Sequence, residues 1–187
     1  MRIAITGGIC DGKTTILGFL RELGFSTVSA DEVVRGLYLQ PKFQAALAER
    51  FGPEALDGNR VNRDFLRNAI TQHASARRFV NSLVHKSAME RILQMTEADG
   101  PAFAEVPLLI ETAMQGFFDR VWVASAGYET QLSRLIERCG AEAPARSLLA
   151  TQLPTEAKEP FASAIIRTNR PEEVVKKDVV DLANGLH

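Results

Sequence analysis

The sequence lacks the features of a membrane or secreted protein. No apolar run among its 187 residues approaches the roughly 18 residues of a spanning helix. The first residues look like a strand, not like the charged and apolar parts of a signal peptide. Its two cysteines, Cys10 and Cys139, are too few for a disulfide framework and have no zinc-ligand spacing to a histidine. We therefore expect a cytoplasmic protein.

An excess of charge of one sign is also missing. The 22 Lys and Arg residues and 23 Asp and Glu residues give a formal net charge of -1. The chain as a whole therefore does not attract nucleic acid or an anionic membrane, and any phosphate-binding charge must be local. We expect no nucleic-acid or membrane partner, and a monomer or weak homo-oligomer. The 45% of hydrophobic residues is sufficient for a globular core.

Five short apolar segments, separated by helical patterns, predict an α/β fold with a parallel sheet wrapped by helices. They are Arg2–Thr6, Ser26–Ala30, Pro101–Val106, Arg120–Ser125 and Ser163–Arg167. The interval between the second and third segments is long and its pattern, over residues 33–99, is helical. This interval predicts an inserted helical lobe for substrate.

A further helix is predicted over Tyr128–Cys139, because its apolar residues share one face and Gly140 can cap its end. Arg134 and Arg138 are four residues apart, so both emerge on one side of this helix. More short helix is expected over 141–160, and a last helix over 171–186.

The loop from Gly7 to Thr14 fits the pattern G-x-x-x-x-G-K-[ST] between a predicted strand and a predicted helix. Glycines let backbone N–H groups converge on phosphate oxygens, and the start of the helix adds its positive dipole end. Lys13 supplies a cation, and Thr14 offers a hydroxyl to Mg²⁺. ATP and Mg²⁺ are the expected ligands. The predicted nucleotide-binding residues are Gly8, Ile9, Cys10, Asp11, Gly12, Lys13, Thr14 and Thr15.

Two residues of this loop are unusual. Asp11 places an acid inside an anion cradle, so its side chain is predicted to point outward. Cys10 is either redox-sensitive or a small residue that fills a tight turn, and we assign it no function.

The loop alone does not name a reaction. An Asn-Lys-x-Asp guanine-binding motif is absent from the sequence, and the chain is short for the remaining machinery of a GTPase. A kinase is therefore favoured.

Acidic residues follow two of the predicted strands. The carboxyl ends of neighbouring parallel strands meet at one edge, so Asp31, after the second strand, can reach a phosphate bound after the first. It could accept a proton from a hydroxyl group and help place Mg²⁺, or it could cap the following helix. Glu105 closes the third strand and either supports the metal or substrate or is a solvated acid.

The arginine pair after the fourth strand also has two interpretations. Arg134 and Arg138 could neutralise charge on the transferred phosphoryl group, or they could form a solvated helix face.

Taken together, these segments resemble the dephospho-CoA kinase family, which catalyses the last step of coenzyme A synthesis. The resemblance covers nearly the whole chain. It rests on Ile5-Thr6-Gly7-Gly8-Ile9 with Gly12-Lys13-Thr14, Ala30-Asp31 with Arg35, Leu83-Val84-His85, Val106-Pro107-Leu108-Leu109 with Glu111, Phe118-Asp119-Arg120-Val121-Trp122-Val123, Glu129-Thr130-Gln131-Leu132 with Arg134 and Arg138, and Gln152-Leu153-Pro154 with Lys158.

The resemblance implies a P-loop NTPase fold, with a five-stranded parallel sheet flanked by helices, a helical substrate-binding insertion and a helical lid. The nucleotide-binding core would comprise 1–32, 101–126 and 161–187. The CoA lobe would be 33–100, and the lid 127–160.

The resemblance also implies transfer of the ATP γ-phosphate to the 3′-hydroxyl of the dephospho-CoA ribose. Asp31 would be the base, Lys13 and Arg138 would bind phosphates, and Thr14 with Asp31 would hold Mg²⁺. The implied substrate-binding residues are Thr6, Asp31, Arg35, His85 and Leu108.

The chain departs from the family pattern at several positions. Asp11 stands where the family usually has serine, and Lys86 stands where a proline usually follows the histidine. Thr168 and Arg170 change a segment near the adenine site, which puts nucleotide preference in question. Two rival hypotheses remain: another P-loop kinase of nucleotides or small molecules, and a nucleotide-binding module without catalysis.

Overall fold

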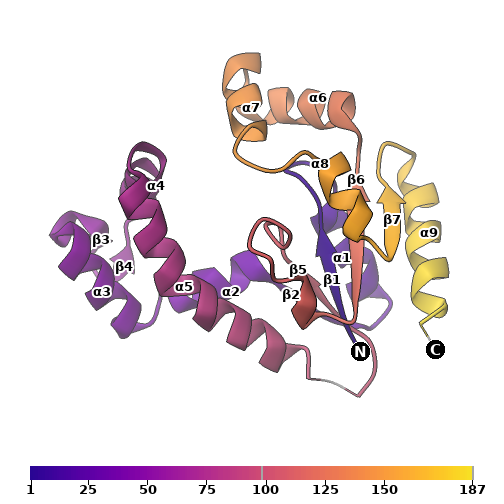
Figure 1. Ribbon diagram of the computed structural model, residues 1–187, viewed down its shortest axis with the longest axis horizontal. Coiled ribbons are helices and arrows are strands. Elements are labelled where there is room, and N and C mark those ends of the chain that lie inside the picture. The colour runs from indigo at the N-terminus through magenta and orange to yellow at the C-terminus, as the bar shows by residue number, and fades with distance from the viewer. Residues whose placement is uncertain (98, 187) are drawn as a thin grey trace. The chain divides into compact units, whose positions relative to one another are not determined.

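The computed structural model describes residues 1–97 and 99–186 and has an α/β architecture built on a five-stranded parallel sheet (Figure 1). The strand order is β2-β5-β1-β6-β7. The strands are β1 (Arg2–Thr6), β2 (Ser26–Ser29), β5 (Ala102–Glu105), β6 (Arg120–Ser125) and β7 (Ala164–Arg167). The predicted fold class and all five predicted strands are confirmed.

Two compact units make up the chain, Met1–Val28 with Thr96–His187, and Ser29–Met95. The first unit contains the sheet. Its central strand β1 is buried on both faces, since Ile3, Ala4 and Ile5 are all 0% exposed. A strand covered on both sides has an uninterrupted apolar sequence, which is why this segment was recognisable.

Helices α1 (Lys13–Glu22) and α9 (Glu172–Asn184) pack together and share one core with the sheet. Phe103 of β5 lies beside Trp122 of β6, with ring centroids 5.1 Å apart. Burial of such aromatic side chains supplies a large part of the free energy that holds the helices on the sheet.

The register of the sheet brings several strand ends to one edge. Ile5 pairs with Glu105 of β5, and Thr6 pairs with Val123 of β6. The strand order corrects one step of the prediction, because β5 lies between β1 and β2. The carboxylate on the strand next to β1 is therefore that of Glu105, and Asp31 follows a strand one place further out.

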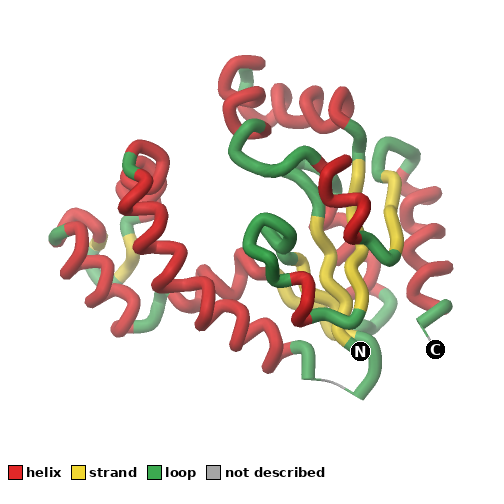
Figure 2. Tube along the Cα trace, in the orientation of Figure 1, coloured by secondary structure: helices red, strands yellow, loops and turns green. Residues whose placement is uncertain are grey.

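Three α-helices lie between β6 and β7 in the chain, within the first unit (Figure 2). They are α6 (Tyr128–Cys139), α7 (Glu142–Leu149) and α8 (Thr155–Lys158). The predicted bounds of α6 are confirmed, and Gly140 ends it in the left-handed conformation, with φ 75°. Leu132, Leu135 and Ala145 form the apolar contact between α6 and α7.

The second unit is mostly helical and has its own core. Its helices are α2 (Ala30–Leu37), α3 (Pro41–Phe51), α4 (Arg63–Gln72) and α5 (Ala74–Met95). A short hairpin of β3 (Leu56–Asp57) and β4 (Arg60–Val61) was not predicted. The sequence showed only a break there, because Gly58, with φ 57°, closes a turn between strands too short to show alternation.

Three single-turn 3₁₀ helices complete the described elements, at Pro53–Ala55, Gln115–Phe117 and Glu159–Phe161. No helix among the described residues has both the length and the apolar character needed to cross a membrane.

Candidate active site

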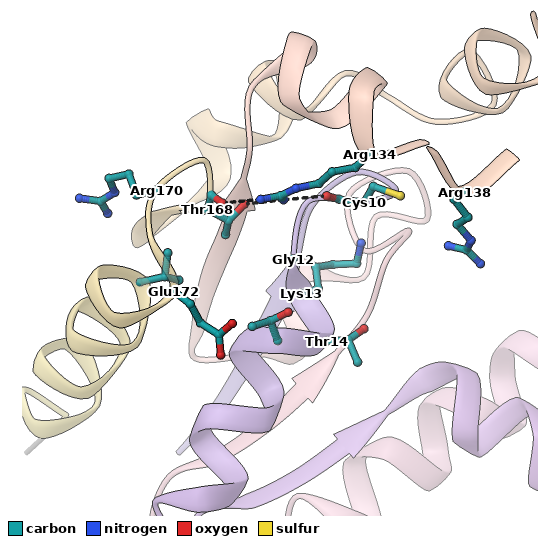
Figure 3. Close-up of a pocket in the computed structure, with 11 residues that line it drawn as sticks. Cys10, Gly12, Lys13, Thr14, Arg134, Arg138, Thr168, Arg170 and Glu172 are labelled. Carbon is teal, nitrogen blue, oxygen red and sulfur yellow. Dashed lines mark hydrogen bonds between the residues drawn. The ribbon is translucent and has the colours of Figure 1, made fainter. Parts of the chain in front are cut away.

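The loop between β1 and α1 forms one wall of the site (Figure 3). Gly12 is the N-cap residue of α1, adopts φ 83°, and provides no side-chain hydrogen bond to the first turn. The N–H groups of a first helical turn have no partner within the helix, and they attract anions together with the helix dipole. The start of α1 therefore has the geometry of a phosphate-binding site.

A cavity of about 400 Å³ opens at this helix start. It is lined by Cys10, Gly12, Lys13, Thr14, Thr15, Arg134, Arg138, Thr168, Arg170, Glu172 and Val175. Five of the eight predicted nucleotide-binding residues are in this set. Gly8 and Ile9 line a neighbouring cavity of about 370 Å³ under α6 and α7. The first cavity is of the size that small-molecule ligands occupy.

Lys13 is largely buried at the base of the loop, and its ammonium group donates a hydrogen bond of 2.7 Å to the carbonyl of Gly8. Cys10 has φ 62°, a left-handed conformation that is uncommon outside glycine. The loop therefore curls in the way that its glycines predicted, and Cys10 accepts backbone strain within it.

The loop is packed tightly from behind. A Cβ atom added at Gly8 would lie 2.2 Å from Nε2 of Gln131 and 2.8 Å from Oγ1 of Thr155. Gln131 donates a hydrogen bond of 2.7 Å to the carbonyl of Ile9, and Gln152 accepts one of 3.1 Å from the Ile9 N–H. The residues after β6 therefore define the shape of the loop.

The prediction that Asp11 points outward is wrong. Asp11 is 0% exposed, and its carboxylate accepts hydrogen bonds from the backbone N–H groups of Gly8 and Ala126, at 2.6 and 3.0 Å. The hydroxyl of Thr155 also donates to it. The acid is tolerated because three donors satisfy its charge on the inner side of the loop.

The two arginines of α6 have different environments, although both line the cavity. Arg134 donates to the carbonyls of Cys10 and Thr168, at 3.1 and 2.7 Å (Figure 3). Arg138 is exposed and has no hydrogen bond or ion pair within residues 1–97 and 99–186. Arg134 therefore holds the loop in place, and Arg138 is available to a ligand.

Thr14 and Glu105 meet at the end of the sheet. The Thr14 hydroxyl donates a hydrogen bond of 3.1 Å to Oε1 of Glu105, whose side chain is largely buried. A hydroxyl and a carboxylate beside a phosphate site are suitable oxygen ligands for Mg²⁺. The remaining ligands of a protein-bound Mg²⁺ are usually water molecules and substrate oxygens. These two side chains fit the expected metal.

The predicted substrate-binding residues belong to both units. In the first, Thr6 is fully buried and donates a hydrogen bond of 3.2 Å to the carbonyl of Pro107, and the neighbouring Leu108 is 39% exposed. In the second, Asp31 and Arg35 are exposed on α2, and His85 is partly exposed on α5.

Asp31 does not cap its helix. The N-cap residue of α2 is Ser29, and Asp31 follows in the first turn. Its side chain makes no hydrogen bond or ion pair with any residue that the structure describes. The helix-cap alternative is therefore excluded, and the proton-accepting role remains a prediction.

Gln131, Thr155 and Lys158 were not assigned roles from the sequence, although all three contact the loop. Gln131 and Lys158 lie in segments that carry the family resemblance, which was the available signal. Local patterns could not reveal these contacts, because the partners are between 122 and 151 residues apart along the chain.

An ion pair between Glu159 and Arg167 lies at the ends of β6 and β7 beside the site. Glu159 accepts hydrogen bonds from Arg167 and from the hydroxyl of Ser125. The hydrogen bonds from Arg167 hold the pKa of Glu159 below its ordinary value of 4.5.

Comparisons with known proteins identify the family of the whole chain. The family model for dephospho-CoA kinase matches residues 1–173. A dephospho-CoA kinase of Streptococcus mutans is 33% identical over 184 residues, which are 95% of this chain and 93% of the relative.

Two solved structures share the fold. A Thermus thermophilus protein superposes with a TM-score of 0.83 at 22% identity, covering 100% of this chain and 98% of its own. A dephospho-CoA kinase from Campylobacter jejuni superposes with a TM-score of 0.67 at 22% identity, covering 99% and 96%.

Proposed function

Since this chain belongs to the dephospho-CoA kinase family, we propose that it transfers the γ-phosphoryl group of ATP to the 3′-hydroxyl of the dephospho-CoA ribose. The products are coenzyme A and ADP. The observation that carries the proposal is the convergence of Lys13, Thr14 and Arg138 on one cavity at the start of α1. Such an arrangement suits phosphoryl transfer, which depends mainly on positioning and on neutralising charge.

The donor side of the reaction is assigned to the loop and to α6. The backbone N–H groups at the start of α1 bind phosphate oxygens of ATP, and the ammonium of Lys13 turns from the Gly8 carbonyl to the phosphates. Arg138, which is exposed in the same cavity, approaches the phosphoryl group as charge spreads over its oxygens.

Thr14 and Asp31 are proposed as ligands of Mg²⁺, as the sequence predicted. We add Glu105 to this set because it accepts a hydrogen bond from Thr14. When bound, Mg²⁺ neutralises negative charge on the phosphates. Glu105 orients the Thr14 hydroxyl by accepting a hydrogen bond from it, so that the lone pairs of the hydroxyl oxygen remain available.

The acceptor side is assigned to the residues that the family resemblance implies. Asp31, an exposed carboxylate without a partner among the described residues, accepts the proton of the ribose hydroxyl. The substrate site is proposed to consist of Thr6, Arg35, His85 and Leu108. Residues 33–100 are proposed as the CoA lobe. Residues 127–160 are proposed as a lid that excludes water from the reaction.

A coupled assay of ADP release tests the proposal. Purified protein is given ATP and Mg²⁺ with dephospho-CoA, and in parallel with a panel of nucleoside monophosphates that includes thymidylate. We expect turnover with dephospho-CoA as the acceptor and none with the nucleoside monophosphates. Coenzyme A should form in a 1:1 ratio to ADP, and EDTA should abolish the activity. Lys13→Ala serves as the inactive control, because the lysine charge acts in both binding and catalysis.

Two results would contradict the proposal. Phosphorylation of a nucleoside monophosphate without reaction of dephospho-CoA would indicate a different P-loop kinase. Binding of ATP without turnover of any acceptor would indicate a nucleotide-binding module.

A further inference from the structure

Lys158 is a fully buried lysine at the end of α8, a short helix that packs against β6 (Figure 1). Its ammonium nitrogen lies 2.7 Å from Oε1 of Glu111, 3.2 Å from the carbonyl oxygen of Pro107 and 3.3 Å from the carbonyl oxygen of Gly7. A lysine ammonium group has three hydrogens to donate. The two carbonyl oxygens accept hydrogen bonds and the Glu111 carboxylate forms an ion pair, so the buried charge has three oxygen partners.

The backbone acceptors belong to two different parts of the proposed site. Gly7 is the first residue of the phosphate-binding loop, and Pro107 precedes Leu108 in the loop after β5. The hydroxyl of Thr6 donates to the same Pro107 carbonyl. One buried cation therefore joins the loop on the donor side to a loop predicted to contact the acceptor.

Helix α8 also contacts two further residues of the phosphate-binding loop. Thr155, one turn before Lys158, donates a hydrogen bond to the carboxylate of Asp11 and accepts one of 3.2 Å from the N–H of Gly8. Both contacts come from a four-residue segment, so displacement of α8 would affect the loop at Gly7, Gly8 and Asp11 together.

A purely stabilising role explains this arrangement poorly. A buried ion pair pays a desolvation penalty that often cancels its attraction, and an apolar pair of similar volume is frequently as stable. The geometry points to Lys158 as a positioning residue that fixes the phosphate-binding loop relative to the Pro107–Leu108 loop. Its kinetic consequence rests on the proposed kinase reaction, because in-line transfer requires donor and acceptor to be aligned.

The first test compares three variants by steady-state kinetics and thermal unfolding. Lys158→Met removes the charge at similar length and leaves the carboxylate of Glu111, whose side chain is 17% exposed, without its cation. Lys158→Met combined with Glu111→Gln removes both charges, so the penalty of an unpaired, partly buried carboxylate disappears. Lys177→Met, a lysine whose side chain is 78% exposed and paired with Asp181 four residues later, is the control.

We expect kcat to fall about tenfold to a hundredfold in both Lys158 variants, with KM for ATP changed less than about threefold. The double variant should regain thermal stability relative to Lys158→Met without regaining kcat, because Gly7 and Pro107 still lack their donor. Lys177→Met should match the wild type. Recovery of both stability and kcat in the double variant would overturn the proposal.

The second test does not depend on the identity of the acceptor. Hydrogen–deuterium exchange is measured on peptides that cover Gly7–Gly12 and Pro107–Glu111. Faster exchange in both segments of both Lys158 variants, but not in Lys177→Met, would support the coupling. Unchanged exchange in either segment would refute it, even if the wild-type protein proved to phosphorylate a different acceptor.

Discussion

The carboxylate of Asp11 accepts a hydrogen bond from the backbone N–H of Gly8, three residues earlier in the same loop, with 2.6 Å between the two atoms. Its second oxygen accepts from the N–H of Ala126, at the end of β6. The Asp11 side chain therefore holds the loop in its curled conformation through Gly8 and links it to the sheet through Ala126. An acid in a phosphate-binding loop is compatible with function because its charge is engaged by these donors.

Asp11→Asn tests this interpretation. The amide keeps the volume but replaces one acceptor oxygen with a donor, so either Gly8 or Ala126 faces an N–H group and a buried donor loses its partner. We expect the free energy of unfolding to fall by about 1–3 kcal/mol, measured by urea denaturation.

Asp64→Asn is the matched control for Asp11→Asn. Asp64 has a side chain 86% exposed and pairs with Arg67 on the surface of α4, so its loss should cost less than about 0.5 kcal/mol. Equal and small effects of the two substitutions would show that the Asp11 hydrogen bonds contribute little.

The arginine pair of α6 predicts two different kinetic defects. Arg134→Met removes the hydrogen bonds to the Cys10 and Thr168 carbonyls, so the loop loosens. We expect a higher KM for ATP and a lower melting temperature. Arg138→Met leaves the fold intact, because Arg138 has no partner in the described part of the chain, and should lower kcat by at least about a hundredfold.

Kinetics and differential scanning fluorimetry on both arginine variants separate the two roles. A loss of melting temperature in Arg138→Met would contradict the assignment of Arg138 to the ligand. An unchanged KM for ATP in Arg134→Met would remove Arg134 from the support of the loop.

The sequence predicted those elements whose signals are local. The apolar run of β1 and the glycine after α6 gave correct bounds, because strand burial and the left-handed helix end are determined by neighbouring residues. The phosphate-binding loop was recognisable for the same reason: its glycines and lysine are contiguous in the chain.

Features that depend on distant residues were not predictable in this way. The direction of Asp11 is set by Ala126 and Thr155, which lie 115 and 144 residues away. The order of the strands likewise depends on where β5 inserts, and no local pattern shows that it lies between β1 and β2. The separate environments of Arg134 and Arg138 follow from the position of Thr168, not from their spacing in the helix.

Asp31→Asn tests the proposed base. The amide cannot accept the hydroxyl proton, so kcat should fall by about a hundredfold or more while KM for ATP stays near the wild-type value. Glu32→Gln, the neighbouring acid in the same first turn of α2, is the control and should retain activity. Near-normal turnover of Asp31→Asn would exclude proton transfer to this residue.

The ion pair of Glu159 with Arg167 predicts an acid-dependent part of the stability. Because the pKa of Glu159 is lower in the folded protein than its ordinary 4.5, the folded state favours the ionised form. The resulting stabilisation is fully present above about pH 4.5 and is lost as the pH falls through the lower folded-state value.

Glu159→Gln should therefore be less stable than the wild type at pH 7, and the difference should shrink as the pH is lowered below 4.5. Urea denaturation from pH 7 to pH 3 measures this difference. Glu49→Gln, an exposed acid on α3, controls for general loss of negative charge. The stability difference between Glu159→Gln and wild type could instead stay constant over this range. That result would show that the ionisation of Glu159 does not stabilise the junction of β6 and β7. A neutral carboxyl would then bind Arg167 and Ser125 equally well.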